Sequence, residues 1–214
     1  MQKCIDQKGA NGWYLHVKPE HIQGRDTKGK IRVLNTPDDF FATAKEVGFV
    51  AVVLNFRDNQ LARQVSSFEM SHGVGEEFGP GTPNFLTDAS QSFVEPDMVG
   101  VFEEQARLYN NAVLGARHSG LYIEHLSFNN VTHDICSAAR VVAQTSARCP
   151  KFKCVEDVRN FKAAAHARTL VERVGTAAAA SLVTQLTGTP YAWMLDLSVS
   201  TWPADVPRRI PILS

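Results

Sequence analysis

The chain has no long hydrophobic run. Its longest strictly apolar stretch extends from Phe49 to Leu54, far short of the roughly 20 residues that a membrane helix needs. The first residues, 1–13, also lack the apolar core of a secretory signal peptide. We therefore expect no membrane-spanning helix and an intracellular protein.

The chain also lacks an excess of charge of either sign. Lys and Arg together number 22, as do Asp and Glu, so the formal net charge is zero. This balance argues against a surface that is basic throughout, the usual mark of a nucleic-acid-binding protein. Local groups of arginines still leave nucleic acid open as a partner. A neutral chain has little long-range repulsion between its copies, which favours self-association.

Cysteines are few and catalytic motifs are missing. Four cysteines without a signal peptide predict reduced thiols in a reducing compartment, either the cytoplasm or a virus particle assembled there. The glycine-rich segment 72–84 lacks the terminal Gly-Lys-Ser/Thr of a phosphate-binding P-loop. No Gly-x-Ser-x-Gly sequence is present to hold a nucleophilic serine. We therefore assign no catalytic residue.

What the chain does have is the composition of a globular protein. Its 214 residues are 44% hydrophobic and 21% charged, which predicts a single domain over 1–200 with a substantial core. The longest segment with helical periodicity, the alanine-rich stretch 154–188, is expected to form the packing centre. Gly175 should break it into two helices, with Thr176 capping the second.

Local signals place the other elements. Thr36 as a cap, Pro37 in the first turn and Gly48 as the stop predict a helix over 36–47. The apolar segment 49–56 then predicts a strand buried on both faces. Further expected elements are short strands within 12–34, helices at 57–70, 96–114 and 133–146, and strands at 121–128 and 191–199. The expected fold is α+β, with helix predominating in the core region 36–188.

The last residues, 201–214, form a distinct segment. Three prolines exclude regular structure, so an extended arm is expected. The arm is too apolar for a solvated tail and must lie on its own domain or on a neighbour. Its candidate partner-binding residues are Trp202, Val206, Arg208, Arg209, Ile210, Ile212 and Leu213.

A metal site is the alternative. His133, Cys136, Cys149 and Cys154 form two short-spaced pairs that resemble the ligand spacing of structural zinc modules. The expected helix 133–146 opposes this, because it would hold Cys136 and Cys149 roughly 20 Å apart. A small enzyme could instead use the histidines near Glu124. Adjacent strand residues point to opposite faces, so Glu124 and His125 should not act as a pair.

These observations favour a non-enzymatic, self-associating structural subunit without a cofactor, such as a viral coat or capsid protein. Its expected partners are copies of itself or neighbouring subunits of a large assembly. The alternative is a zinc-stabilised binding module or a small enzyme with a histidine-containing site.

Overall fold

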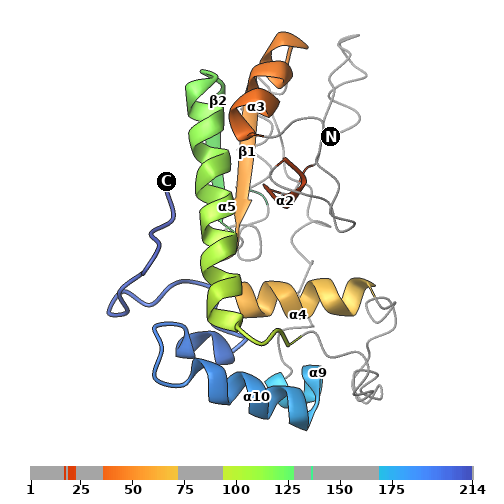
Figure 1. Ribbon diagram of the computed structural model, residues 1–214, viewed down its shortest axis with the longest axis vertical. Helices are drawn as coiled ribbons and strands as arrows, with labels where there is room; N and C mark the ends of the chain where they lie inside the picture. The colour runs from red at the N-terminus through yellow and green to blue at the C-terminus, as the bar shows by residue number, and fades with distance from the viewer. Residues whose placement is uncertain are drawn as a thin grey trace. The chain divides into compact units, whose positions relative to one another are not determined.

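The computed structural model describes residues 17, 19–22, 36–71, 94–127, 136 and 169–213 (Figure 1). They form several helices and a two-stranded parallel sheet, which confirms an α+β fold dominated by helix. The chain divides into two compact units. The first comprises Met1–Phe56, Ala106–Phe161 and Ile212–Ser214, and the second comprises Arg57–Gln105 and Lys162–Pro211. The single domain expected over 1–200 stays a prediction.

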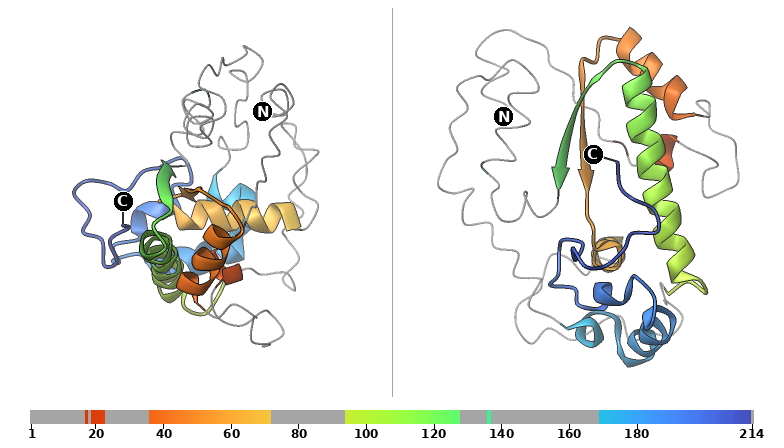
Figure 2. Two further views of the ribbon diagram at one scale, coloured as in Figure 1. Left: turned by 90° about the horizontal axis from the view of Figure 1, so that it is seen from above. Right: turned by 90° about the vertical axis from the view of Figure 1, so that its left-hand side faces the viewer.

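The sheet lies in the first unit. Strands β1 (Ala51–Phe56) and β2 (Tyr122–Ser127) pair in parallel, and Figure 2 shows them side by side with helix α5 (Met98–His118). The register pairs Ala51 with Tyr122 and Phe56 with Ser127. The short helix α2 (Pro19–Ile22) lies within 12–34, where the sequence predicted only short strands joined by a polar connection.

Helix α3 (Pro37–Glu46) begins and ends as the sequence predicts. The Thr36 hydroxyl accepts a hydrogen bond from the Asp39 amide at 3.1 Å, which satisfies an amide that has no partner within the helix. Gly48 follows the last turn with a φ of 96°, a conformation that costs other residues energy.

Two hydrophobic clusters hold the first unit together. Leu54 of β1 packs with Tyr109 and Val113 of α5. The second cluster contains Ile22, Phe41, Ala112, Ala116 and Leu121. The strand expected to be buried on both faces is buried on one only, because Asn55 is exposed while Leu54 packs against α5.

The second unit contains α4 (Gln60–Ser71), the first turns of α5, α9 (Leu170–Val174), α10 (Thr176–Leu186) and the 3₁₀ helix η4 (Ala192–Leu195). Its core is one cluster of buried side chains from all these elements: Leu61, Ala62, Val65, Met98, Phe102, Val174, Ala179, Leu182, Leu186, Tyr191, Met194 and Leu197.

Two expectations for the second unit were wrong in detail. Gly175 does separate α9 from α10, but Thr176 makes no capping bond; the capping box belongs to Thr169, with Glu172, at the start of α9. The strand expected over 191–199 is instead η4 followed by turns. Buried Tyr191, Met194 and Leu197 recur every third residue, which matches a 3₁₀ repeat rather than strand alternation.

Other boundaries moved by a few residues. Helix α5 extends to His118 rather than ending near residue 114, because buried Ala116 continues its apolar stripe. Helix α4 begins at Gln60 rather than residue 57. The strand expected over 12–18, all but Val17, lies outside the described residues. The expected strand 31–34 also lies outside them, as do the helix over 133–146, except Cys136, and the segment 154–168.

Candidate anion-binding site

Four consecutive polar residues follow β1 directly: Arg57, Asp58, Asn59 and Gln60. We call this segment the RDNQ turn. Arg57, Asn59 and Gln60 are all buried, which is unusual for side chains of this kind. The turn belongs to the second unit and connects directly to the first turn of α4.

Asn59 is the anchor of the turn. Its side-chain oxygen accepts a hydrogen bond from the Ala62 amide at 2.9 Å and so caps α4. Its side-chain nitrogen lies 2.9 Å from the Val199 carbonyl oxygen and 3.0 Å from that of Asp196. A third carbonyl, of Met194, lies 3.3 Å away. One buried amide group thus ties the start of α4 to the segment 194–199.

Gln60 and Arg63 extend this polar network. The side-chain nitrogen of Gln60 donates a hydrogen bond to the Arg57 carbonyl oxygen, so this bond lies within the RDNQ turn. Arg63 donates to the side-chain oxygens of Gln60 at 3.3 Å and of Gln105 at 2.9 Å. The backbone around Arg57 is therefore held from inside the turn.

Two arginines are buried near one another in this unit. Arg57 is 7% exposed and Arg173, on α9, is 2% exposed. The Arg173 guanidinium donates to the Ser66 hydroxyl at 3.2 Å, and that hydroxyl donates to the Ala62 carbonyl at 2.9 Å. Burial, and then the positive charge of Arg173, lower the pKa of Arg57 to about 10. Arg57 therefore remains charged at neutral pH.

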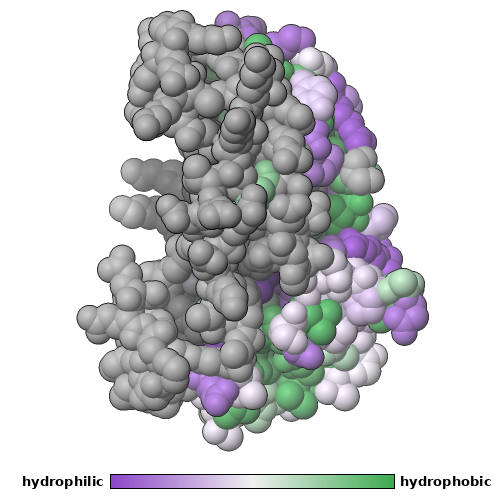
Figure 3. Space-filling model, turned by 180° about the vertical axis from the view of Figure 1, so that it is seen from behind, coloured by the Kyte–Doolittle hydropathy of each residue, from purple (hydrophilic) through white to green (hydrophobic). Residues whose placement is uncertain are grey.

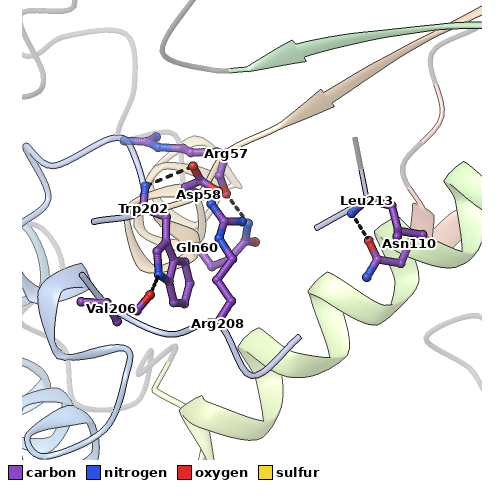
Figure 4. Close-up of polar contacts among 8 residues, drawn as sticks. All are labelled: Arg57, Asp58, Gln60, Asn110, Trp202, Val206, Arg208 and Leu213. Carbon is purple, nitrogen blue, oxygen red and sulfur yellow. Dashed lines mark hydrogen bonds and ion pairs between the residues drawn. The ribbon is translucent and has the colours of Figure 1, made fainter. Parts of the chain in front are cut away.

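The C-terminal arm binds the RDNQ turn through the Asp58 side chain (Figure 4). One carboxylate oxygen of Asp58 accepts from the Trp202 amide at 3.1 Å, and the other accepts from Arg208 at 2.9 Å. The Arg208 guanidinium also lies 4.7 Å from the centre of the Trp202 ring, within cation–π range. The Trp202 indole donates to the Val206 carbonyl at 2.7 Å. We call Asp58, Trp202 and Arg208 the clasp.

Aromatic side chains surround Trp202. Its ring contacts those of Tyr191 and Trp193 edge to face, at centroid distances of 5.7 and 5.2 Å. The Tyr191 hydroxyl donates to Glu103 at 3.4 Å, and Arg209 donates to the same carboxylate oxygen at 3.2 Å. Burial, followed by the negative charge of Glu103, raises the pKa of Tyr191 to about 12.

The end of the arm lies in the first unit. The Leu213 amide donates to the Asn110 side chain at 2.9 Å (Figure 4), and Ile212 and Leu213 pack against the cluster of Leu54. The arm was expected to lie either on its own domain or on a neighbouring molecule. Six of the seven candidate residues contact other residues of the same chain, and the seventh, Ile210, is half-buried. Their role in binding a partner stays a prediction.

Of the residues considered for zinc, the structure describes Cys136 alone. Cys136 is disulfide-bonded, which differs from the reduced thiols expected from the sequence, and zinc binds the thiolate instead. His133, Cys149 and Cys154 lie outside the described residues. The residues that the structure describes contain no group of three or more His, Cys, Asp or Glu suited to a metal ion. The zinc alternative remains a prediction.

The histidines near Glu124 behave as the strand geometry predicts. Glu124 accepts from the Tyr122 hydroxyl at 2.8 Å, whereas the Nδ1 atom of His125 lies 3.1 Å from the Tyr109 hydroxyl. The two neighbours therefore point to opposite faces of the sheet. Burial, followed by the positive charge of Arg117, lowers the pKa of His125. His118 pairs with Asp38 at 3.0 Å on the surface.

The sequence analysis did not identify the RDNQ turn or Arg173. A run of four polar residues directly after an apolar strand was the available signal for the turn. No local pattern marks Arg173 as buried.

None of the helices formed by the described residues combines the length and the apolar character needed to cross a bilayer. No family model, curated protein or solved structure matches the chain.

Proposed function

We propose that the second unit binds a small ligand through a phosphate or sulfate group, held by Arg57 and Arg173. The observation that carries this proposal is the burial of two guanidinium groups close enough for one charge to lower the pKa of the other. An anion placed beside both guanidinium groups would interact favourably with two positive charges at once.

The chemistry of the site favours a tetrahedral oxyanion. A guanidinium presents its N–H donors in a planar fork that matches phosphate and sulfate oxygens. The Ser66 hydroxyl already lies beside Arg173, and the first turn of α4 begins three residues after Arg57, where helix amides attract anions. Because both arginines are more than nine-tenths buried, the ligand must bring a terminal anionic group inward. This favours a small molecule over a nucleic-acid backbone.

Titration calorimetry with phosphate, sulfate and pyrophosphate tests the proposal, with acetate at matched ionic strength as the carboxylate comparison. We expect Arg57→Gln and Arg173→Gln each to weaken phosphate binding at least tenfold, about 1.4 kcal/mol. The control is Arg209→Gln, which removes an exposed arginine of the same unit. Equal phosphate affinity in all these variants would contradict the proposal, and tighter binding of acetate than of phosphate would indicate a carboxylate ligand.

We also propose the self-associating structural subunit, such as a coat protein, as a second candidate. Its support is a group of exposed apolar side chains in the first unit: Val47 and Val50, each 70% exposed, and Tyr122, 57% exposed. The Tyr122 amide donates to the Val50 carbonyl at 3.2 Å, so these two residues are neighbours. Figure 3 shows hydrophobic groups among hydrophilic ones on one face of the molecule.

Light scattering tests this second candidate. Self-association through the Val50 group predicts a solution mass well above 23.6 kDa that Val50→Lys lowers. The matched control is Val183→Lys, an exposed valine on α10. A monomer at every protein concentration would exclude the assembly. Deletion of 201–214 tests separately whether the arm connects subunits.

A further inference from the structure

His125 of β2 lies where the sheet of the first unit packs against α5. It is half-buried and pairs with Leu54 in the register of the two strands. Its Nδ1 atom lies 3.1 Å from the hydroxyl of Tyr109 on α5. Tyr109 is 4% exposed, and the centre of its ring lies 4.6 Å from that of Phe56. A side chain that can gain a proton between pH 5 and 8 is thus hydrogen-bonded to a buried residue of the core.

Among the described residues, the charged groups around His125 come from α5 and from β2 itself. Arg117 is eight residues after Tyr109, so both lie on one side of α5, and the positive charge of Arg117 acts on the imidazole. Glu124 points to the opposite face of the sheet and offsets part of that effect. Strand β1 contributes no ionisable side chain, and neither do residues 212–213, which pack on the same cluster. A proton on His125 would therefore add positive charge beside a positive charge.

We infer that the contact between Tyr109 and His125 makes the packing of α5 on the sheet sensitive to acid. This inference is independent of the anion binding proposed above. At neutral pH the Tyr109 hydroxyl donates to Nδ1 of a neutral His125, whose hydrogen is on Nε2. Acid adds a proton to Nδ1, so the acceptor is lost and the hydroxyl must turn to accept a hydrogen bond instead. The contact between α5 and β2 weakens as a result.

The direction of the pH dependence follows from the surroundings of His125. Burial, followed by the charge of Arg117, lowers the pKa of His125 below its ordinary value of 6.5. As the pH falls through about 6.5, the unfolded chain therefore takes up a proton at this position before the folded chain does. The stability that depends on the neutral imidazole is complete above pH ~7 and is lost as the pH falls. At pH 5.5 this group can raise the equilibrium constant for opening the first unit by at most about tenfold.

Amide hydrogen exchange in β1 and β2 measures the opening of the first unit in the full chain, once the rates are corrected for the intrinsic effect of pH. Protection should fall between pH 7.5 and 5.5, and His125→Asn should reduce that fall by up to about tenfold. Asparagine keeps a polar side chain near the Tyr109 hydroxyl but does not titrate. The matched control is His118→Asn, which removes a surface histidine of the same unit and should leave the fall unchanged, because exposed ion pairs contribute little.

Nitrogen NMR of the imidazole gives a second readout that needs no variant, so it decides the question even if His125→Asn fails to fold. We expect the hydrogen on Nε2 at pH 7.5 and a titration midpoint below 6.5. A hydrogen on Nδ1 at pH 7.5 would overturn the inference. The same loss of protection in the unmodified protein and in His125→Asn would also overturn it.

Discussion

Replacing Asn59 by alanine should destabilise the second unit more than any other single change in the RDNQ turn. The substitution removes the cap of α4, worth about 1 kcal/mol. It also removes the donors to the carbonyls of Met194, Asp196 and Val199. The Asn59 nitrogen carries two hydrogens, so two full bonds are lost at about 1 kcal/mol each. The expected loss in the free energy of unfolding is about 3 kcal/mol.

Thermal unfolding followed by circular dichroism measures this loss. For a chain of this size, 1 kcal/mol corresponds to roughly 2–4 °C, so Asn59→Ala should lower the Tm by roughly 6–12 °C. Asn55→Ala, at an exposed asparagine of β1, is the control and should change the Tm little. A loss below about 1 kcal/mol for Asn59→Ala would refute the reasoning, because one unsatisfied buried carbonyl alone should cost that much.

Asn59→Asp tests the direction of the same hydrogen bonds. The new carboxylate keeps the acceptor for the Ala62 amide but, when ionised, has no hydrogen to donate to the three carbonyls. Its pKa in the folded protein should therefore lie above the ordinary value of about 3.9. The folded state then binds more protons at this position than the unfolded state, so the stability of the variant relative to the unmodified protein is highest below pH ~4 and falls as pH rises toward the raised pKa. A penalty independent of pH would contradict the donor assignment.

Three further predictions concern other parts of the chain. Thr36→Ala should destabilise α3 by about 1 kcal/mol, because it removes the acceptor for the Asp39 amide, whereas Thr36→Ser should restore most of the loss in a denaturant titration. One tyrosine should ionise near pH 12, and Tyr191→Phe should remove it from an absorbance titration; because that pKa is raised, the contribution of Tyr191 to stability is present below pH ~10 and is lost above it. Reduction should increase the number of reactive thiols, because Cys136 is disulfide-bonded. Four reactive thiols in the denatured, unreduced protein would contradict this prediction. Metal analysis would then test whether the reduced cysteines bind zinc.

The elements best predicted from the sequence are those defined by local chemistry. Thr36 and Pro37 fix the start of α3 within a few residues of chain, and Gly48 and Gly175 mark helix ends for the same reason. Capping bonds and positive φ angles depend on residues that are neighbours along the chain. They can therefore be predicted from the sequence alone. The strand predicted over 121–128 is confirmed as β2 (Tyr122–Ser127).

The errors have a common cause in tertiary packing. The segment 191–199 has the composition of a strand, yet the core of the second unit accepts Tyr191, Met194 and Leu197 from one side only. That arrangement favours a 3₁₀ turn. Propensity is a weak guide wherever packing of this kind decides the backbone.

The sequence by itself determined the α+β class, the capped start of α3 and the irregular C-terminal arm, because each depends on periodicity, caps or prolines within a short stretch. Only the tertiary structure decided where the arm lies and which charges meet. Arg57 and Arg173 come together, and Asp58 meets Arg208, although these residues are far apart in the chain. Burial and electrostatic pairing are properties of the packed chain, and no local pattern encodes them.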